Sequence, residues 1–331
     1  MCGSSVGNNE QNDFRRPPGI DGVKHPRRDP GRGLPCYVRP LACATQKRGS
    51  FLAGAHVNRP ELLQRAGTLV LVGAGKMGGA LLEGWLALGV DPTRIVVMEP
   101  QPIASIEALS ARGLRINPDT ASVCSDAIVI AVKPQTAPQV MPQMASLTSP
   151  STVVVSIMAG RTIAFLADAL PRGAAIIRAM PNTPASIGRG ITVAVPNSSV
   201  TSSQQQLADA LLMATGAVEW ITDESLMDAV TAVSGSGPAY VFLLAESLGR
   251  AAEKVGLPAD LAARLARATV AGSGELLHRS PVEAAMLRQN VTSPGGTTAA
   301  ALDVLMAPDG LDPLMERAVV AATRRGRELA G

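Results

Sequence analysis

Aromatic residues are scarce in this chain: among its 331 residues there are four Phe, two Trp and two Tyr. The hydrophobic cores must therefore be built from aliphatic side chains, mainly Leu, Val, Ile, Met and Ala. Proteins that bind single-stranded nucleic acid commonly stack bases on aromatic rings. The shortage of rings argues against that function, while the length leaves room for two domains of ordinary size.

Positive charge is lacking where a nucleic-acid surface would need it. Eleven Lys or Arg face five Asp or Glu within residues 1–66, which leaves nineteen basic and twenty-two acidic residues in residues 67–331. The formal net charge of +3 therefore comes from the N-terminal segment, and the remainder is mildly acidic. We expect no nucleic-acid partner.

Few side chains are available for metal binding or nucleophilic catalysis. The chain has three His and four Cys, of which only Cys124 and His278 lie after residue 66. They provide no metal-ligand cluster, disulfide framework or Ser/His/Asp arrangement, so we expect no bound metal. The small number of thiols fits a reducing cytoplasm.

The first 66 residues lack hydrophobic periodicity and are rich in Gly, Pro, Arg, Asn and Ser, a composition typical of disorder. They contain no continuous apolar stretch of the kind found in secretory signal peptides. A transit peptide should lack acids, yet Glu10, Asp13, Asp21 and Asp29 interrupt this segment. We predict a disordered extension, favour an upstream-extended gene model over a targeting segment, and expect a cytoplasmic protein without membrane association.

A nucleotide signature follows this segment. The apolar run 68–72 leads into Gly73-Ala74-Gly75-Lys76-Met77-Gly78, and a helical pattern follows. In a strand–turn–helix unit the first glycine makes the tight turn, the second admits pyrophosphate, and the third lets helix and strand pack closely. Another apolar run ends in Glu99, 26 positions after Gly73, where an acid can accept a hydrogen bond from an adenosine ribose. The signature predicts dinucleotide binding; the alternative is an empty glycine turn in another α/β sheet.

Further strands and helices alternate up to about residue 222. The runs 126–132, 152–158, 175–179 and 191–195 favour strands, and 103–112 and 138–146 favour helices. Such alternation predicts an α/β fold with a parallel sheet covered by helices on both faces. Ligands of such sheets bind beyond the carboxyl ends of the strands. The candidate cofactor contacts there are Val132-Lys133-Pro134 and Asn182.

Beyond residue 222 only helical patterns remain. Six helices are predicted, at 225–234, 240–255, 259–277, 282–289, 298–305 and 314–327. Several are apolar on most faces and need more partners than one such unit offers, so we expect this part to form an oligomer interface. The predicted organisation is a disordered extension over 1–66, a nucleotide-binding domain over 67–222 and a helical domain over 223–331.

A second candidate ligand site lies in the helical part, at Val291-Thr292-Ser293-Pro294-Gly295-Gly296-Thr297-Thr298. This pattern predicts a glycine turn that opens a helix. Free N–H groups and the partial positive charge of a helix start can hold a carboxylate or phosphate without Arg or Lys. The alternative is that the two threonines only cap the helix.

Five motifs together resemble the pyrroline-5-carboxylate reductase family, over about residues 67–330. They are Gly73-Ala74-Gly75-Lys76-Met77-Gly78, Ala131-Val132-Lys133-Pro134-Gln135, Arg178-Ala179-Met180-Pro181-Asn182-Thr183-Pro184, Ser234-Gly235-Ser236-Gly237-Pro238-Ala239-Tyr240 and the 291–298 turn. The family reduces 1-pyrroline-5-carboxylate to L-proline with NADPH or NADH, the last step of proline biosynthesis. The resemblance implies a Rossmann-like domain, an all-helical dimerisation domain, and a homodimer or a ring of dimers.

The resemblance also implies site roles. It places the substrate against Ser293, Gly295, Gly296, Thr297 and Thr298, with the Thr298 hydroxyl as the catalytic partner of the imine nitrogen. Glu224 matches an acid of the substrate domain, although an acid early in a helix commonly stabilises the helix dipole. Asn290 matches a residue at the nicotinamide end of the cofactor, although by itself it fits the end of a helix. Lys133 follows a predicted strand, where a cation is expected near the cofactor ribose or phosphates; the alternative is a solvated loop lysine.

Two features depart from the family pattern. An acid often precedes proline before the substrate turn, whereas this chain has Ser280 before Pro281. NADPH-preferring members usually have a neutral or basic residue where this chain has Glu99. Because an acid there repels the 2′-phosphate, we hypothesise that NADH is used at least as well as NADPH.

Two other functions fit part of the sequence. β-Hydroxyacid dehydrogenases share the glycine turn but carry Lys and Asn on the first helix of the second domain, and residues 235–244 contain neither. A cofactor-binding sensor or partner-binding module without catalysis would not need the second ligand site.

Overall fold

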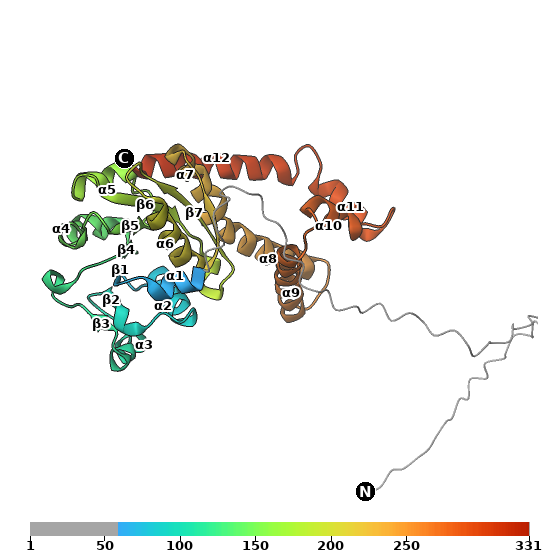
Figure 1. The fold of residues 1–331 in the computed structure, drawn as a ribbon. Coiled ribbons are helices and arrows are strands. Elements are labelled where there is room, and N and C mark those ends of the chain that lie inside the picture. The colour runs from blue at the N-terminus through green and yellow to red at the C-terminus, as the bar shows by residue number, and fades with distance from the viewer. Residues whose placement is uncertain (1–58, 331) are drawn as a thin grey trace, which may run out of the picture. The chain divides into compact units, whose positions relative to one another are not determined.

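The computed structural model describes residues 59–330 (Figure 1). The predicted disordered extension lies outside the described residues except at its end, where helix α1 spans Arg59–Arg65. Leu63 of α1 is only 1% exposed and belongs to the hydrophobic core. The predicted extension therefore includes a helix that belongs to the folded part. The sequence did not reveal this helix, because seven residues are too few to show a clear hydrophobic period.

Eight strands form one sheet in the order β3-β2-β1-β4-β5-β6-β7-β8. Figure 1 shows the helices on both sides of it, as predicted. The strands are β1 Leu69–Val72, β2 Ile95–Met98, β3 Arg115–Ile116, β4 Ala127–Ile130, β5 Val153–Ser156, β6 Ala175–Met180, β7 Gly190–Pro196 and β8 Gly216–Trp220.

The expectation of a wholly parallel sheet is wrong, because β6 and β7 pair antiparallel. Their connection contains only the short 3₁₀ helix Thr183–Ile187, and a parallel crossover needs a dozen or more residues. β8 runs parallel to β7 again, since α6 (Ser202–Met213) crosses between them. The sequence patterns did not indicate β3, which is two residues long, or β8, which begins with Gly216 and contains the exposed Glu219.

The core has two layers because consecutive residues of each central strand point to opposite faces of the sheet. On β1, Leu69 and Leu71 pack in one layer with α1, α2 (Lys76–Ala87), α3 (Ala104–Glu107) and α6. Val70 and Val72 pack in the other layer with α4 (Ala137–Leu147) and α5 (Ile163–Ala169). Burial on both faces holds the strand ends in fixed positions, and the candidate cofactor residues follow these ends.

All elements after β8 are helical, as predicted. A 3₁₀ turn leads into α7 and a π-helix, and α8 and α9 pack against each other. The elements are the 3₁₀ turn Glu224–Leu226, α7 Met227–Val230, the π-helix Thr231–Gly235, α8 Gly237–Lys254, α9 Ala259–Arg279, α10 Ala284–Asn290, α11 Thr297–Leu305 and α12 Leu311–Ala330. Within residues 59–330, no helix is both long and apolar enough to traverse a bilayer.

The helical part leaves large apolar side chains in solvent in the single chain. On α8, Phe242 is 67% exposed, and Val241, Leu244 and Leu248 are also exposed. Monomeric proteins rarely expose contiguous apolar surface of this kind. These side chains fit the expectation that another copy of the chain covers the helical part.

Candidate functional site

The turn between β1 and α2 requires glycine at two positions. Gly73 has a φ of 88°, and its N–H donates to the Met98 carbonyl at 2.9 Å. A Cβ on Gly78 would lie 2.1 Å from the Gly73 carbonyl oxygen, so only glycine lets α2 start this close to the turn. Gly75 faces open space and caps α2 without a side-chain hydrogen bond. This leaves room and free N–H donors for a pyrophosphate, so the residues fit a dinucleotide.

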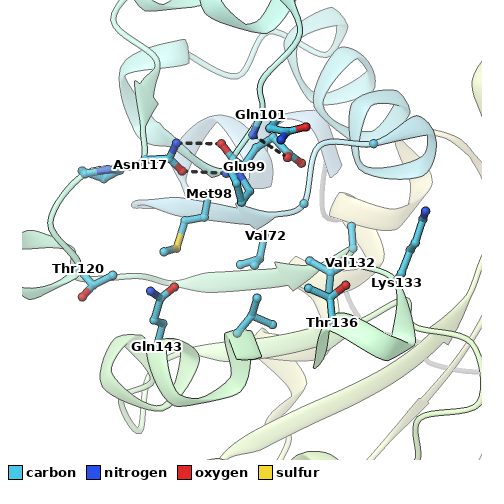
Figure 2. A pocket seen from close by; sticks show the side chains of 16 residues that line it. Val72, Met98, Glu99, Gln101, Asn117, Thr120, Val132, Lys133, Thr136 and Gln143 are labelled. Atoms are coloured by element: carbon cyan, nitrogen blue, oxygen red, sulfur yellow. Dashed lines mark hydrogen bonds between the residues drawn. The ribbon is translucent and has the colours of Figure 1, made fainter. Parts of the chain in front are cut away.

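A cavity of about 960 Å³ lies beside this turn, at the carboxyl ends of β1, β2 and β4 (Figure 2). Its volume is in the range of ligand sites. Of the predicted cofactor residues it contains Gly73, Gly75, Glu99, Val132 and Lys133. Among the described residues that line it, Lys133 is the one cation, and no Arg lines it.

Glu99 lies beside the glycine turn, at the end of β2. Its Oε2 accepts a hydrogen bond from the Ala74 N–H at 2.9 Å, and its Oε1 accepts one from the Gln101 N–H at 3.1 Å. The carboxylate therefore lies at the wall of the cavity, with acceptor capacity left for ribose hydroxyl groups. A phosphate at the same place would meet a negative charge at short range.

A second cavity, of about 530 Å³, continues along the edge of the sheet. It shares Gly75, Ala131, Val132 and Lys133 with the first. The predicted residues Lys76, Met77, Pro134 and Asn182 also line it, as do Met158, Met180 and Gly235, to which the sequence analysis assigned no role in the site. The thioether side chains make this end of the crevice apolar, which suits a nicotinamide ring kept away from water.

Two side chains hold the main chain of turns that line the second cavity. Asn182 Oδ1 accepts a hydrogen bond from the Ile191 N–H at 2.9 Å and so fixes the turn into β7. The guanidinium of Arg161, which was not predicted from the sequence, donates to the Pro134 carbonyl at 2.9 and 3.2 Å and lies 4.5 Å from the Phe165 ring centroid. Arg161 therefore holds the turn that carries Lys133.

Glu224 lies at the joint between the sheet and the helices. Its Oε1 accepts hydrogen bonds from Arg178 Nη1 at 2.9 Å and from the Ile163 N–H at 2.8 Å. The Arg178 side chain is only 6% exposed and the Glu224 side chain is 30% exposed, so the pair is partly removed from water. Glu224 lines neither cavity of the described chain. This arrangement gives its carboxylate a structural task that the resemblance did not indicate.

The 291–298 turn opens α11 as the sequence predicts. Gly295 has a φ of 68°, and Gly296 is the N-cap residue without any side-chain capping bond. Thr297 and Thr298 are the first two residues of α11, so neither occupies the N-cap position itself. The first N–H groups of α11 lack intrahelical acceptors, as at any helix start, so they are available to a carboxylate.

This turn is remote from the crevice within one chain. None of Asn290, Ser293, Gly295, Gly296, Thr297 and Thr298 lines either cavity of the described part. The C-terminal end of α12 lies beside Gly160, which follows β5, since a Cβ there would be 3.5 Å from the Leu329 carbonyl oxygen. The N-terminal end of this 20-residue helix lies about 30 Å away and is connected to α11 (Figure 1).

Two family models match the chain. The model described as "NADP oxidoreductase coenzyme F420-dependent" covers residues 68–160, which contain the glycine turn and Glu99. The model described as "Pyrroline-5-carboxylate reductase dimerisation" covers residues 224–329, which contain the exposed apolar helices and the 291–298 turn. The matches agree with the position of the cofactor crevice and with self-association through the helical part.

Curated relatives and solved structures point the same way. A pyrroline-5-carboxylate reductase of Pseudomonas aeruginosa is 38% identical over 79% of this chain and 96% of its own length. One of Synechocystis is 39% identical over 79% and 97%. The structure of a pyrroline-5-carboxylate reductase from Coxiella burnetii has a TM-score of 0.75 and 33% identity, covering 81% of this chain and 100% of that one. The Plasmodium falciparum pyrroline carboxylate reductase, with NADP bound, has a TM-score of 0.68 and 30% identity over 81% and 99%.

Proposed function

This chain belongs to the pyrroline-5-carboxylate reductase family, and from that premise we propose how its two ligand sites carry out the reduction of 1-pyrroline-5-carboxylate to L-proline. The protein is an NAD(P)H-dependent oxidoreductase. The observation that carries the proposal is the combination of a dinucleotide crevice at the sheet edge with an uncapped helix start at α11.

The α11 turn binds the substrate. The main-chain N–H groups that follow Gly296 hold the carboxylate, and the hydroxyl of Thr298 contacts the ring nitrogen. A protonated cyclic imine is already electrophilic, so the residues act mainly by positioning and by electrostatic stabilisation. When bound, the reduced nicotinamide supplies the hydride to the imine carbon, and the nitrogen keeps its proton in the product.

The crevice binds the cofactor. The main chain from Gly73 to Gly78 receives the pyrophosphate, and the Glu99 carboxylate accepts hydrogen bonds from the ribose hydroxyl groups. Lys133 lies between the two cavities and places a positive charge near the phosphates. Asn182 shapes the nicotinamide end, and Asn290 reaches that end from the α11 side.

The partner chain completes each site. The turn lines neither cavity of its own chain and is separated from the sheet edge by the length of α12, so another copy of the helical part has to bring a turn to the crevice. The exposed apolar faces of α8 support such pairing. The helical part matches a dimerisation model, which supports self-association through this part of the chain. We also propose that dimers assemble into a ring.

We further propose the domain bounds, the compartment and the absence of a nucleic-acid partner. The nucleotide-binding domain spans residues 67–222 together with α1, and the helical domain spans 223–331. The protein acts in the cytoplasm, because few cysteines and no disulfide framework in its sequence fit a reducing compartment. It binds no nucleic acid, because residues 67–331 have more acidic than basic residues.

A steady-state assay with 1-pyrroline-5-carboxylate and both cofactors tests the proposed function. We expect turnover to L-proline and a kcat/KM for NADH at least equal to that for NADPH, since Glu99 repels a 2′-phosphate. A preference for NADPH of about a hundredfold would contradict the cofactor assignment. A β-hydroxy acid with the oxidised cofactor is the control substrate. Retained cofactor affinity without any reduction of the imine would instead favour a sensor.

A further inference from the structure

Asn117 adopts a backbone conformation that stands out. It is the one described non-glycine residue with positive φ, at 45°, and it directly follows the two-residue strand β3. Asparagine tolerates this left-handed region better than other side chains, but the conformation is still unfavourable. Its N–H donates to the Val97 carbonyl at 2.9 Å, which extends the pairing of β3 with β2 by one bond. The left-handed turn then directs the Asn117 side chain toward Glu99, the residue that follows β2 (Figure 2).

The Asn117 side chain engages both main-chain polar groups of Glu99. Its Oδ1 accepts from the Glu99 N–H, and its Nδ2 donates to the Glu99 carbonyl, both at 2.8 Å. The amide thus takes the place of a peptide group of a neighbouring strand. Glu99 needs this support because it lies one residue beyond β2, and the last bond from the β1 side, donated by the Gly73 N–H, ends on Met98.

Glu99 is therefore held at two points. Asn117 holds its main chain, and the Ala74 N–H holds its carboxylate at 2.9 Å. We propose that Asn117 is a positioning residue for the cofactor: by fixing Glu99 beside the glycine turn, it sets the preference for NADH over NADPH. This inference rests on the proposed role of Glu99 in binding the ribose.

The two cofactors are expected to respond differently to loss of the Asn117 contacts. A fixed carboxylate accepts hydrogen bonds from ribose hydroxyl groups at low entropic cost, and it cannot move away from a 2′-phosphate. Without the Asn117 contacts, Glu99 must be ordered when it binds the ribose, which costs entropy. Its carboxylate can also move away from a 2′-phosphate, which reduces the repulsion. NADH binding therefore weakens, whereas NADPH binding stays the same or improves. A purely structural role would weaken both equally.

The chain offers a control in Asn197, whose side chain also bonds to a main-chain N–H and a main-chain carbonyl, here of two different residues. Its Oδ1 accepts from the Ile176 N–H at 3.1 Å, and its Nδ2 donates to the Ala174 carbonyl at 2.9 Å. Asn197 lines neither described cavity. Its loss removes a similar set of hydrogen bonds from the sheet without touching the crevice.

The test measures NADH and NADPH affinity by calorimetry without substrate, together with the KM of each cofactor. Asn117→Gly removes the side chain and suits the left-handed backbone. We expect its Kd for NADH to rise about tenfold and its Kd for NADPH to change by less than about twofold, with the effect in KM rather than kcat. Asn197→Ala should lower the Tm and leave both affinities unchanged.

A double-mutant cycle with Glu99→Ala separates the possible outcomes. If Asn117 acts through Glu99, Asn117→Gly has no further effect on NADH binding in the Glu99→Ala background. A persisting effect, or an equal loss for both cofactors, overturns the positioning role. If Glu99→Ala weakens NADH but Asn117→Gly does not, only the role of Asn117 fails. If Glu99→Ala binds NADH normally, the ribose role of Glu99 fails, and the role of Asn117 fails with it.

Discussion

Replacing Gly78 with alanine is expected to reduce cofactor affinity more than about a hundredfold, because the added Cβ would overlap the main chain of the glycine turn. The nearest atom is the Gly73 carbonyl oxygen, 2.1 Å from the position that a Cβ must take. Main-chain atoms cannot move aside as a flexible side chain can. Helix α2 has to shift away from the turn, and its N–H donors leave the pyrophosphate position. Calorimetric titration with NADH measures the loss.

Gly79→Ala is the matched control for this substitution. It adds the same methyl group one position later, where the nearest atom is the Ala74 carbonyl oxygen at 3.6 Å, an ordinary contact distance. Alanine favours helix over glycine, so the Tm should stay equal or rise, with NADH affinity unchanged. If Gly78→Ala bound NADH as tightly as the parent protein, the turn could not be the pyrophosphate site.

Thr298→Ala is expected to lower kcat about a hundredfold with little change in the Kd for NADH. The hydroxyl is proposed to contact the substrate nitrogen, where charge is redistributed during hydride transfer, so its loss acts on the transition state. The cofactor crevice does not include this residue. Steady-state kinetics with saturating cofactor, together with NADH titration, separate the two effects.

Thr298→Ser restores a hydroxyl at the same position and should recover most of the activity. Thr292→Ala serves as the control within the same turn, because the Thr292 hydroxyl is already bonded to the Arg288 carbonyl at 2.7 Å. Full turnover by Thr298→Ala would refute the assigned role of the hydroxyl. An equal loss in Thr292→Ala would indicate that general disturbance of the turn explains the result.

The features that could be predicted from the sequence are local ones. The glycine turn, the acid after β2 and the turn before α11 are each defined by a few consecutive residues whose backbone geometry limits the choice of side chain. Glu99 could be placed near Gly73 because strand ends of a parallel sheet meet at one edge. The contact of its carboxylate with the Ala74 N–H followed only from the structure.

Features that depend on pairings between distant residues could not be predicted. The reversal of β7 is decided by a short connection, and apolar runs such as 191–195 do not carry strand direction. The contacts of Asn117 with Glu99, of Arg161 with Pro134 and of Glu224 with Arg178 join residues 18 to 46 positions apart. No local pattern marks such partners, because the residues around each side chain do not indicate which distant residue it contacts.

If a cofactor crevice and a substrate turn on different chains form one reductase site, mixing two inactive variants should restore activity. Gly78→Ala impairs the crevice and Thr298→Ala impairs the turn. After exchange of subunits in an equal mixture, one site in each mixed dimer has both parts intact, so about a quarter of the parent activity should return. An activity that stays at the average of the two separate variants would contradict a site shared between two chains.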